Sequence, residues 1–376
     1  MRVLLLSYEF PPLGGGGAHV VRDLSRELTR LGHQVDLVTM GYRGLPRQDV
    51  VDGVTVHRVR CVRRKPFVCT MPEAATYLAG ALPVVLGLAA RHHYDIIHAH
   101  FIFPDGLLAW AASRIRRTPF VITAHGSDVP GYNPHRLVLA HKLLTPFWHL
   151  VVHAARCIIC PSAWLQELIR RRCRRGRLTV LPNGILLAKF QSGQARRAHV
   201  LVVTRMLERK GVQYVLEAVS RLERPCPVHL VGDGPYLPAL RAQAERLKLP
   251  VTFWGWMDNS SPQLKELYET SRIFALPSEA ENFPIVLLEA MAAGAAIITS
   301  QGTGCAEVVG ETALLVPPKD AAAIGKAITA LLGEPALAER LGQAARTRIE
   351  QQFSWGAVAT SHVALYEQQL HNGAVR

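Results

Sequence analysis

The sequence predicts an α/β protein with two doubly wound, mostly parallel sheets. Short apolar runs alternate with amphipathic stretches along the chain, a pattern typical of parallel strands joined by helices. At 376 residues the chain is longer than one hydrophobic core usually supports. The alternation is interrupted once, by turn residues at 181–184, and then resumes. We therefore expect two domains of similar size.

The first half of the chain carries the first strand–helix series. A helix is expected at 19–31, closed by Gly32. Apolar runs of four to six residues predict five strands, at 3–7, 34–39, 96–99, 120–124 and 157–160. These elements form one doubly wound sheet.

The second series follows the turn at 181–184 and a polar stretch at 191–198, where we place the interdomain linker. Five more apolar runs predict strands at 200–204, 228–232, 251–254, 273–276 and 296–299. The predicted domains are 1–185 and 186–354. Two such sheets imply a cleft, with ligands beyond the carboxyl ends of the strands.

The positive charge of the chain lies entirely in its first half. Residues 1–190 hold 25 Lys and Arg against 11 Asp and Glu, an excess of 14, while residues 191–376 hold 18 of each. The excess is concentrated in two clusters, Arg63, Arg64 and Lys65, and Arg170, Arg171, Arg172, Arg174, Arg175 and Arg177. Such clusters fit anionic phospholipid headgroups, a phosphate-bearing acceptor or nucleic acid, and also an ordinary solvated face.

Three features favour a cytoplasmic protein that touches a membrane only peripherally. Seven cysteines without regular spacing indicate a reducing compartment. The apolar start at 3–6 is too short for a signal peptide. The uncharged segment 74–90 falls short of the ~20 residues that span a bilayer. We expect it to form a buried or interfacial helix.

The segment from Glu281 to Glu289 is the most specific feature of the sequence. It follows the predicted strand at 273–276 and opens a helix, with Pro284 in the first turn, where its missing N–H costs nothing. The free N–H groups of Ile285 and Val286 would then form an anion site suited to a diphosphate. Two carboxylates flanking such a site are placed to accept hydrogen bonds from sugar hydroxyls.

Two further loops follow predicted strands and suit phosphate groups. Arg205 and Lys210 come after the strand at 200–204, where two cations can face one diphosphate and offset charge that develops on it. The glycine run 14–17, which includes Gly15 and Gly16, follows the first strand and lets backbone approach a ligand closely. It is not a G-x-G-x-x-G dinucleotide fingerprint.

These motifs together resemble those of retaining glycosyltransferase family four. Glu281 and Glu289 match the family's Glu, seven residues, Glu spacing, with Phe283 and Pro284 in place, while Asn282 stands where glycine is usual. Arg205 and Lys210 resemble its Arg-x4-Lys-Gly motif. The resemblance implies the GT-B architecture, in which two Rossmann-like domains face a cleft and a terminal helix at 355–376 packs on the first domain.

The same resemblance implies a reaction. A hexose-type sugar would pass, with retention of configuration, from a UDP- or GDP-linked donor to a glycan or lipid-linked acceptor in cell-surface polysaccharide or glycolipid synthesis. No metal or other cofactor would be required. His125, Glu281, Arg205 and Lys210 would be catalytic. Donor-binding residues would be Gly15, Gly16, Arg205, Lys210, Asp233, Gly234, Trp256, Met257, Glu281, Phe283, Pro284, Ile285, Val286 and Glu289.

Two alternatives come from other functional classes. His98 and His100 share one face of a predicted strand and, with His125 and Asp128, could bind a metal in an amidohydrolase-like hydrolase. That hypothesis leaves the two glutamates and the break at 181–184 unexplained. A binding module without catalysis is the other alternative. Nucleic acid is not an expected partner, because no reading helix or set of exposed aromatics accompanies the charge.

Overall fold

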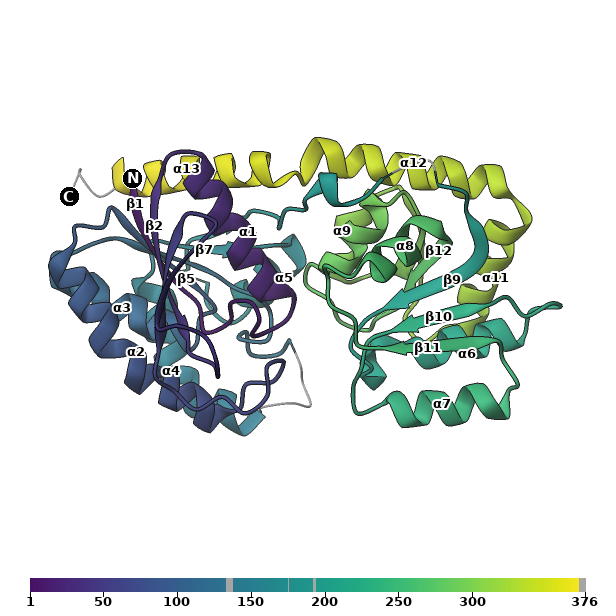
Figure 1. Cartoon of the computed structure of the whole chain (residues 1–376), viewed down its shortest axis with the longest axis horizontal. Helices are drawn as coiled ribbons and strands as arrows, with labels where there is room; N and C mark the ends of the chain where they lie inside the picture. The colour runs from purple at the N-terminus through teal and green to yellow at the C-terminus, as the bar shows by residue number, and fades with distance from the viewer. Residues whose placement is uncertain (133–137, 175, 192–193, 372–376) are drawn as a thin grey trace. The chain divides into compact units, whose positions relative to one another are not determined.

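The computed structural model describes residues 1–132, 138–174, 176–191 and 194–371, with only the backbone described at 138–144. Arg175, part of the second basic cluster, lies outside these residues. The chain divides into two compact units (Figure 1). Unit 1 comprises Met1–Gly184 and Trp355–Arg376, and unit 2 comprises Ile185–Ser354. The first division lies one residue before the expected boundary, because the Ile185 N–H donates to the Phe353 carbonyl within unit 2 (2.8 Å).

Unit 1 is built on an eight-stranded sheet of order β3-β4-β2-β1-β5-β6-β7-β8. All neighbours are parallel except β3 and β4. The strands are β1 (Arg2–Leu6), β2 (Gln34–Met40), β3 (Gln48–Val51), β4 (Val54–Val59), β5 (Ile96–His100), β6 (Phe120–Thr123), β7 (Cys157–Cys160) and β8 (Leu178–Val180). All five strands predicted for this half are present.

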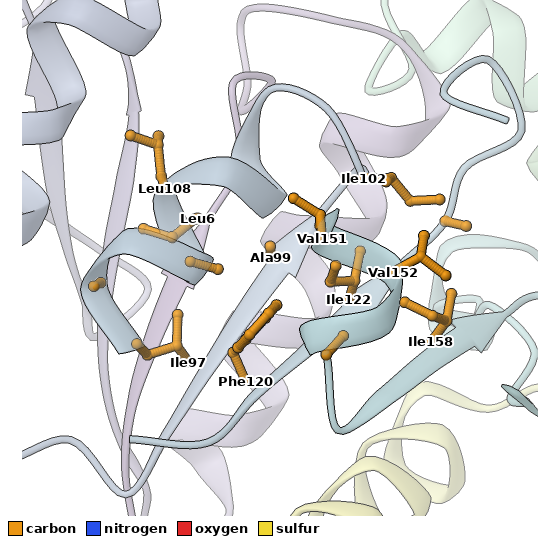
Figure 2. Close-up of a cluster of buried hydrophobic side chains, with 14 of the residues drawn as sticks. Leu6, Ile97, Ala99, Ile102, Leu108, Phe120, Ile122, Val151, Val152 and Ile158 are labelled. Carbon is orange, nitrogen blue, oxygen red and sulfur yellow. The ribbon is translucent and has the colours of Figure 1, made fainter. Parts of the chain in front are cut away.

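Helices cover this sheet and close its core. They are α1 (Gly16–Arg30), α2 (Met71–Arg91), α3 (Asp105–Arg116), α4 (Val138–Ala154), α5 (Ala163–Arg170) and α13 (Trp355–His371). Figure 2 shows Leu108 of α3 and Val151 of α4 packed over Ile97 and Ile122 of the central strands. The carboxyl ends of β5 and β6 are thereby held on a close-packed base, which positions the loops that follow them.

Helix α2 is longer than the uncharged segment that predicted it. It has 21 residues and begins with a capping box formed by Thr70 and Glu73, which the sequence prediction missed. Among the described residues, α2 is the one single helix long and apolar enough to cross a membrane. Tyr77, Ala81 and other residues of one face are buried within unit 1, as in the core helix of a globular domain.

The terminal helix α13 packs beside α1 in unit 1, where Figure 1 shows it in yellow. The Tyr366 hydroxyl is hydrogen-bonded to Nδ1 of His98 on β5 (2.7 Å). Trp355 packs on Gly184 so closely that any Cβ at Gly184 would collide with its indole ring. Helix α13 is thus an integral part of unit 1.

Unit 2 has a six-stranded, all-parallel sheet of order β11-β10-β9-β12-β13-β14. Its strands are β9 (Arg197–Val203), β10 (Val228–Val231), β11 (Val251–Gly255), β12 (Ser271–Leu276), β13 (Ala296–Ser300) and β14 (Ala313–Val316). Its helices are η1 (Leu187–Lys189), η2 (Glu208–Lys210), α6 (Val212–Ser220), α7 (Leu237–Arg246), α8 (Pro262–Thr270), α9 (Ile285–Ala292), α10 (Gly304–Val309), α11 (Ala321–Gly333) and α12 (Pro335–Gln352). The polar stretch predicted as linker runs into β9, because Arg197 and Ala198 already belong to that strand.

Candidate active site

The Glu281 segment lies in the loop between β12 and α9. Pro284 is the residue that precedes α9 rather than part of its first turn, since its backbone is extended. Helix α9 begins at Ile285, so the N–H groups of Ile285 and Val286 have no partner inside the helix. The loop is fixed from behind by Gly304, whose N–H donates to the Glu281 carbonyl (2.9 Å). Gly304 also packs so tightly on the Asn282 carbonyl that a side chain there would collide with it.

Lys210 meets Glu281 in a buried ion pair. Strands β9 and β12 are neighbours, so the loops after their carboxyl ends lie side by side. The Lys210 ammonium donates to the Glu281 carboxylate, and both side chains are about nine-tenths buried, with relative exposures of 10% and 8%. Burial lowers the pKa of Lys210, and the negative charge of Glu281 opposes that shift.

Arg209 ties the same two loops together. Its carbonyl accepts from the Glu279 N–H (2.9 Å), and its guanidinium donates to the Ala280 carbonyl (2.9 Å). Arg205 is exposed and close enough for its charge to lower the pKa of Lys210 further. Cationic groups, one carboxylate and free N–H groups at the start of α9 therefore gather at one edge of the unit 2 sheet.

Glu289 on α9 is almost fully buried, with 2% of its surface exposed. Its Oε1 accepts from the Lys189 ammonium (2.8 Å) and its Oε2 from the Tyr268 hydroxyl (3.0 Å). Neither partner was identified from the sequence. Lys189 lies on η1, a few residues after the Pro182-Asn183-Gly184 turn. That position close after a strong turn was the sequence signal that could have identified Lys189.

The remaining candidates of unit 2 lie after β10 and β11. Asp233 is exposed and its Oδ1 accepts from the Gly234 N–H (2.7 Å). Gly234 packs directly on the Met206 carbonyl, which leaves no room for a Cβ. Trp256 is 52% exposed, while Met257 packs against a core cluster that includes Phe283. The Phe283 ring is in edge contact with that of Phe353. Trp256 thus offers an accessible aromatic face.

In unit 1 the glycine run meets His125. Gly15 and Gly16 are exposed, and α1 begins at Gly16, so half of the run forms the first turn of that helix. At Gly17 an added Cβ would lie 3.1 Å from Phe101, 3.6 Å from Nδ1 of His125 and 3.8 Å from Oε2 of Glu9. The structure therefore brings an imidazole and a carboxylate to the glycine run. Glu9 was not among the predicted residues, although it directly precedes the Phe10-Pro11-Pro12 turn.

Asp128 holds the His125 loop in place. Its Oδ1 accepts from the His125 N–H (3.0 Å) and its Oδ2 from the Ile102 N–H (2.7 Å). Burial raises the pKa of Asp128 to about 6, although these N–H donors favour the ionised form. Both carboxylate oxygens of Asp128 are therefore used to connect the loops after β5 and β6.

The proposed metal constellation is engaged in other contacts. Both ring nitrogens of His98 are hydrogen-bonded, Nδ1 to Tyr366 and Nε2 to the Thr123 hydroxyl (2.8 Å). Among the described residues, the group that could hold a metal is a different one, made of His149, His153 and Cys173. There the His153 Nδ1–H donates to the His149 carbonyl (2.7 Å), and the Cys173 thiol lies 3.5 Å from Nε2. A thiol–imidazole hydrogen bond accounts for that group.

The comparisons with known proteins decide the family. The model of Glycosyltransferase Family 4 matches residues 14–189, and the model of Glycosyl transferases group 1 matches residues 197–334. A glycogen synthase of Mycobacterium tuberculosis is 30% identical over 97% of this chain and 94% of its own length. The chain belongs to glycosyltransferase family 4. The metal-dependent hydrolase hypothesis and the purely binding hypothesis are therefore both wrong in class.

Solved structures of such transferases share the fold of this glycosyltransferase. Sucrose-phosphate synthase from Thermosynechococcus elongatus superposes with a TM-score of 0.86, at 25% identity, over 99% of this chain and 100% of that one. Anabaena HepE, solved with UDP and glucose, gives a TM-score of 0.77 at 18% identity, over 98% of this chain and 100% of HepE. The predicted α/β class with two Rossmann-like domains of the GT-B type is confirmed.

Proposed function

We propose that this glycosyltransferase moves a hexose-type sugar from a nucleoside diphosphate donor to a glycan or lipid-linked acceptor, with retention of anomeric configuration. The observation that carries the proposal is the grouping of Lys210, Arg205, Glu281 and the start of α9 at the carboxyl ends of β9 and β12. Open α/β sheets bind ligands at such ends.

The leaving diphosphate is the natural ligand of the positive groups. Lys210 and Arg205 supply two charges, and the Ile285 and Val286 N–H groups add the positive end of a helix. Charge builds on the diphosphate as the glycosidic bond breaks, so fixed cations lower that barrier. These protein groups do the work that a divalent cation does elsewhere, and the proposed reaction uses no metal.

The nucleoside half has its own candidates. Glu289, oriented by Lys189 and Tyr268, is the proposed acceptor for the ribose hydroxyls, and Trp256 offers a face on which a base can stack. Asp233 and Gly234 lie in the neighbouring loop after β10. HepE was solved with UDP and glucose, which favours a UDP-linked donor here, and a GDP-linked donor is the second choice.

In unit 2, Glu281 is proposed to bind the sugar. In unit 1, Gly15, Gly16 and His125 are proposed, by the family resemblance, as donor-binding and catalytic residues. Glu281 accepts from sugar hydroxyls, and His125 contacts the reacting side of the ring. Breakage of the bond to the diphosphate leaves an oxocarbenium-like sugar. The acceptor hydroxyl attacks it from the face that the diphosphate leaves, and its proton passes to that phosphate. No enzyme carboxylate forms a bond to the sugar.

A transfer assay in chelator tests this reaction. The full chain is incubated with UDP- and GDP-linked hexoses and a panel of glycan and polyprenyl-phosphate sugar acceptors, and the first product is observed by proton NMR. An axial donor linkage should give an axial linkage in the product. An inverted product would contradict retention, and transfer that requires added divalent metal would contradict the metal-free proposal.

The loop from Val62 to Val68 supports a membrane-proximal acceptor and a place at the cytoplasmic face of a membrane. Val62, Phe67 and Val68 are 49%, 41% and 47% exposed, and Arg64 and Lys65 are exposed between them. Arg63 is not part of this basic surface, because its guanidinium is buried and donates to the Lys65 and Pro66 carbonyls. Exposed apolar side chains beside cations suit an anionic lipid surface.

Co-sedimentation with vesicles of phosphatidylglycerol and phosphatidylcholine tests the membrane proposal. Binding at low salt should fall at least roughly tenfold in the Arg64→Glu/Lys65→Glu double variant, since each cation contributes about 1 kcal/mol. The matched control, Arg224→Glu/Arg246→Glu, reverses two exposed charges in unit 2 and should bind as the unchanged protein does. Equal loss in both variants, or no binding at all, would contradict the proposal.

A further inference from the structure

Among the described residues, His100 is the one that hydrogen-bonds to the imidazole of His125. His100 ends β5 and pairs with Thr123 on β6, two residues before His125. The two rings are stacked with centroids 5.4 Å apart, and Nδ1 of His100 lies 3.2 Å from Nε2 of His125. In a hydrogen bond between two neutral imidazoles, one nitrogen must carry the proton and the other must accept it.

Burial around the other nitrogen of His100 decides the direction of that bond. Nε2 of His100 is buried and has no hydrogen-bond partner within the described residues. If His100 accepted at Nδ1, its proton would sit on Nε2, as a buried donor without an acceptor. If His100 donates from Nδ1, Nε2 keeps only a lone pair. Orphaned buried N–H groups are rare and cost ~1–3 kcal/mol, so donation by His100 is favoured.

Burial keeps both rings neutral. Burial lowers the pKa of His125 to about 3 and lowers the pKa of His100 well below its usual value. The neighbouring imidazoles of His98 and His125 add to the shift at His100. An imidazolium at either position is therefore disfavoured throughout the physiological range.

Donation by His100 leaves His125 with its proton on Nδ1. That atom faces the glycine run, 3.6 Å from the point where a Cβ on Gly17 would lie. Phe101 covers the His125 ring at a centroid distance of 4.3 Å, and its own backbone is held at a φ of 84°, in a region that bulky residues seldom adopt. The ring orientation is thus fixed from two sides, and one N–H points at the ligand side.

We propose that His100 is a positioning residue that donates its Nδ1–H to Nε2 of His125 and so holds His125 as the Nδ1–H tautomer. His125 is then a hydrogen-bond donor toward an oxygen of the bound sugar. This role rests on the proposed function, but the tautomer itself is a property of the free protein. The arrangement selects ligands that present an accepting oxygen beside the glycine run and disfavours those that present only a donor.

Nitrogen NMR of the ligand-free full chain tests the tautomer directly. Histidine is labelled with ¹⁵N, His125 is assigned by loss of its signals in His125→Gln, and long-range proton–nitrogen correlations identify the protonated nitrogen. The predicted result is a protonated, pyrrole-like Nδ1 and a pyridine-like Nε2 at His125 near neutral pH. A protonated Nε2 at His125 in the unchanged protein would overturn the proposal, whether or not transfer activity is ever found.

Variants of His100 then connect the tautomer to catalysis. His100→Leu removes the donor, so His125 loses the side-chain hydrogen bond that fixes its ring, and kcat should fall by roughly tenfold, the effect of one hydrogen bond. His100→Asn places an amide donor near the former Nδ1 and should restore kcat to within roughly threefold of the unchanged protein. His362→Leu is the matched control, because it removes a buried imidazole of α13 that does not bond to His125. An unchanged kcat in His100→Leu would also overturn the role.

Discussion

The ammonium of Lys210 donates a hydrogen bond to the carboxylate of Glu281 across two neighbouring loops of unit 2, and both side chains are almost fully buried. The pair joins the residue assigned to the leaving diphosphate with the residue assigned to the sugar. Removing one partner of a buried ion pair destabilises the folded protein far more than the intact pair stabilises it, because the remaining charge stays buried without compensation. Substitutions at this pair therefore have to separate folding from function.

Replacing Glu281 with Gln should lower the transfer rate much more than nucleotide affinity. The amide oxygen can still accept from Lys210, so the loop is kept, while the negative charge toward the sugar is lost. We expect kcat to fall by at least roughly a hundredfold, as for loss of one preorganised catalytic group. The dissociation constant for UDP, measured by calorimetry, should change by less than about threefold.

Glu281→Ala provides the contrast, since it leaves Lys210 charged and unpaired in a buried site and should destabilise unit 2 by ~3–5 kcal/mol. Equal losses of rate and of UDP affinity in Glu281→Gln would count against the role assigned to Glu281.

Gly304→Ala should disturb the site from outside it. The new methyl group would collide with the Asn282 carbonyl, so the loop that carries Glu281 must move. We expect a loss of ~1–3 kcal/mol in the free energy of unfolding, the usual cost of overpacking, with a large loss of activity. Gly333→Ala is the control, because nothing lies near its Cβ position and it ends helix α11. Its Tm should be unchanged or higher; similar Tm losses in both variants would refute the explanation.

The fall in transfer activity at low pH should come from protonation of Asp128 and not of His125. Burial raises the pKa of Asp128 to about 6 in the folded protein, against ~3.9 for an unfolded aspartate. The free energy of unfolding therefore decreases as the pH rises from about 3.9 to about 6, because the unfolded chain ionises more readily. Below pH 6 the added proton competes with the His125 and Ile102 N–H donors for the two carboxylate oxygens. His125, with a pKa of about 3, stays neutral.

Activity measured from pH 5 to 8 should therefore fall with an apparent pKa near 6 on the acid side. Asp128→Asn should be less active at every pH and should lack that fall. Persistence of the fall in Asp128→Asn would assign it to another group.

Lys189→Met should weaken nucleotide binding through Glu289. The Lys189 ammonium orients Oε1 of Glu289, while Tyr268 holds Oε2. Loss of one charge-assisted hydrogen bond of this kind is worth about 1.5–3 kcal/mol, so we expect UDP affinity to fall by roughly tenfold or more. A ligand without ribose should not show this effect. The affinity for inorganic diphosphate should be nearly the same in Lys189→Met as in the unchanged protein. Equal weakening of both ligands would place Lys189 at the diphosphate.

The sheets could be predicted from the sequence where strands are buried on both faces. Residues 3–6 of β1 and the segment Cys157–Cys160 are continuous apolar runs, and strands were predicted at 3–7 and 157–160. Strand β3, Gln48–Val51, was missed because it is antiparallel and partly exposed, and β8 was missed because it has only three partly exposed residues. Strands β4 and β14 were also missed, and β4 alternates polar and apolar residues along the chain.

The residues of the candidate site could be predicted from sequence motifs, but their contacts with one another could not. Lys210 and Glu281 are 71 residues apart, and no local pattern relates them. Only the sheet order, with β9 beside β12, brings their loops together. Composition likewise assigned Arg63 to an exposed basic cluster, although the backbone carbonyls of its own loop bind it inside unit 1. His100 was noted as a metal ligand, and its bond to His125 became visible only in three dimensions.

The central claim is that unit 2 holds a nucleoside diphosphate without a metal. The most direct measurement is the Tm of the full chain in chelator, alone and with UDP, GDP, ADP and their sugar conjugates, for the unchanged protein and for Lys210→Met. The account predicts a rise in Tm selective for one nucleotide, about 2.7 kcal/mol of stabilisation at a hundredfold excess over Kd, and a much smaller rise in Lys210→Met. No shift with any nucleotide, together with a shift on adding zinc, would contradict it.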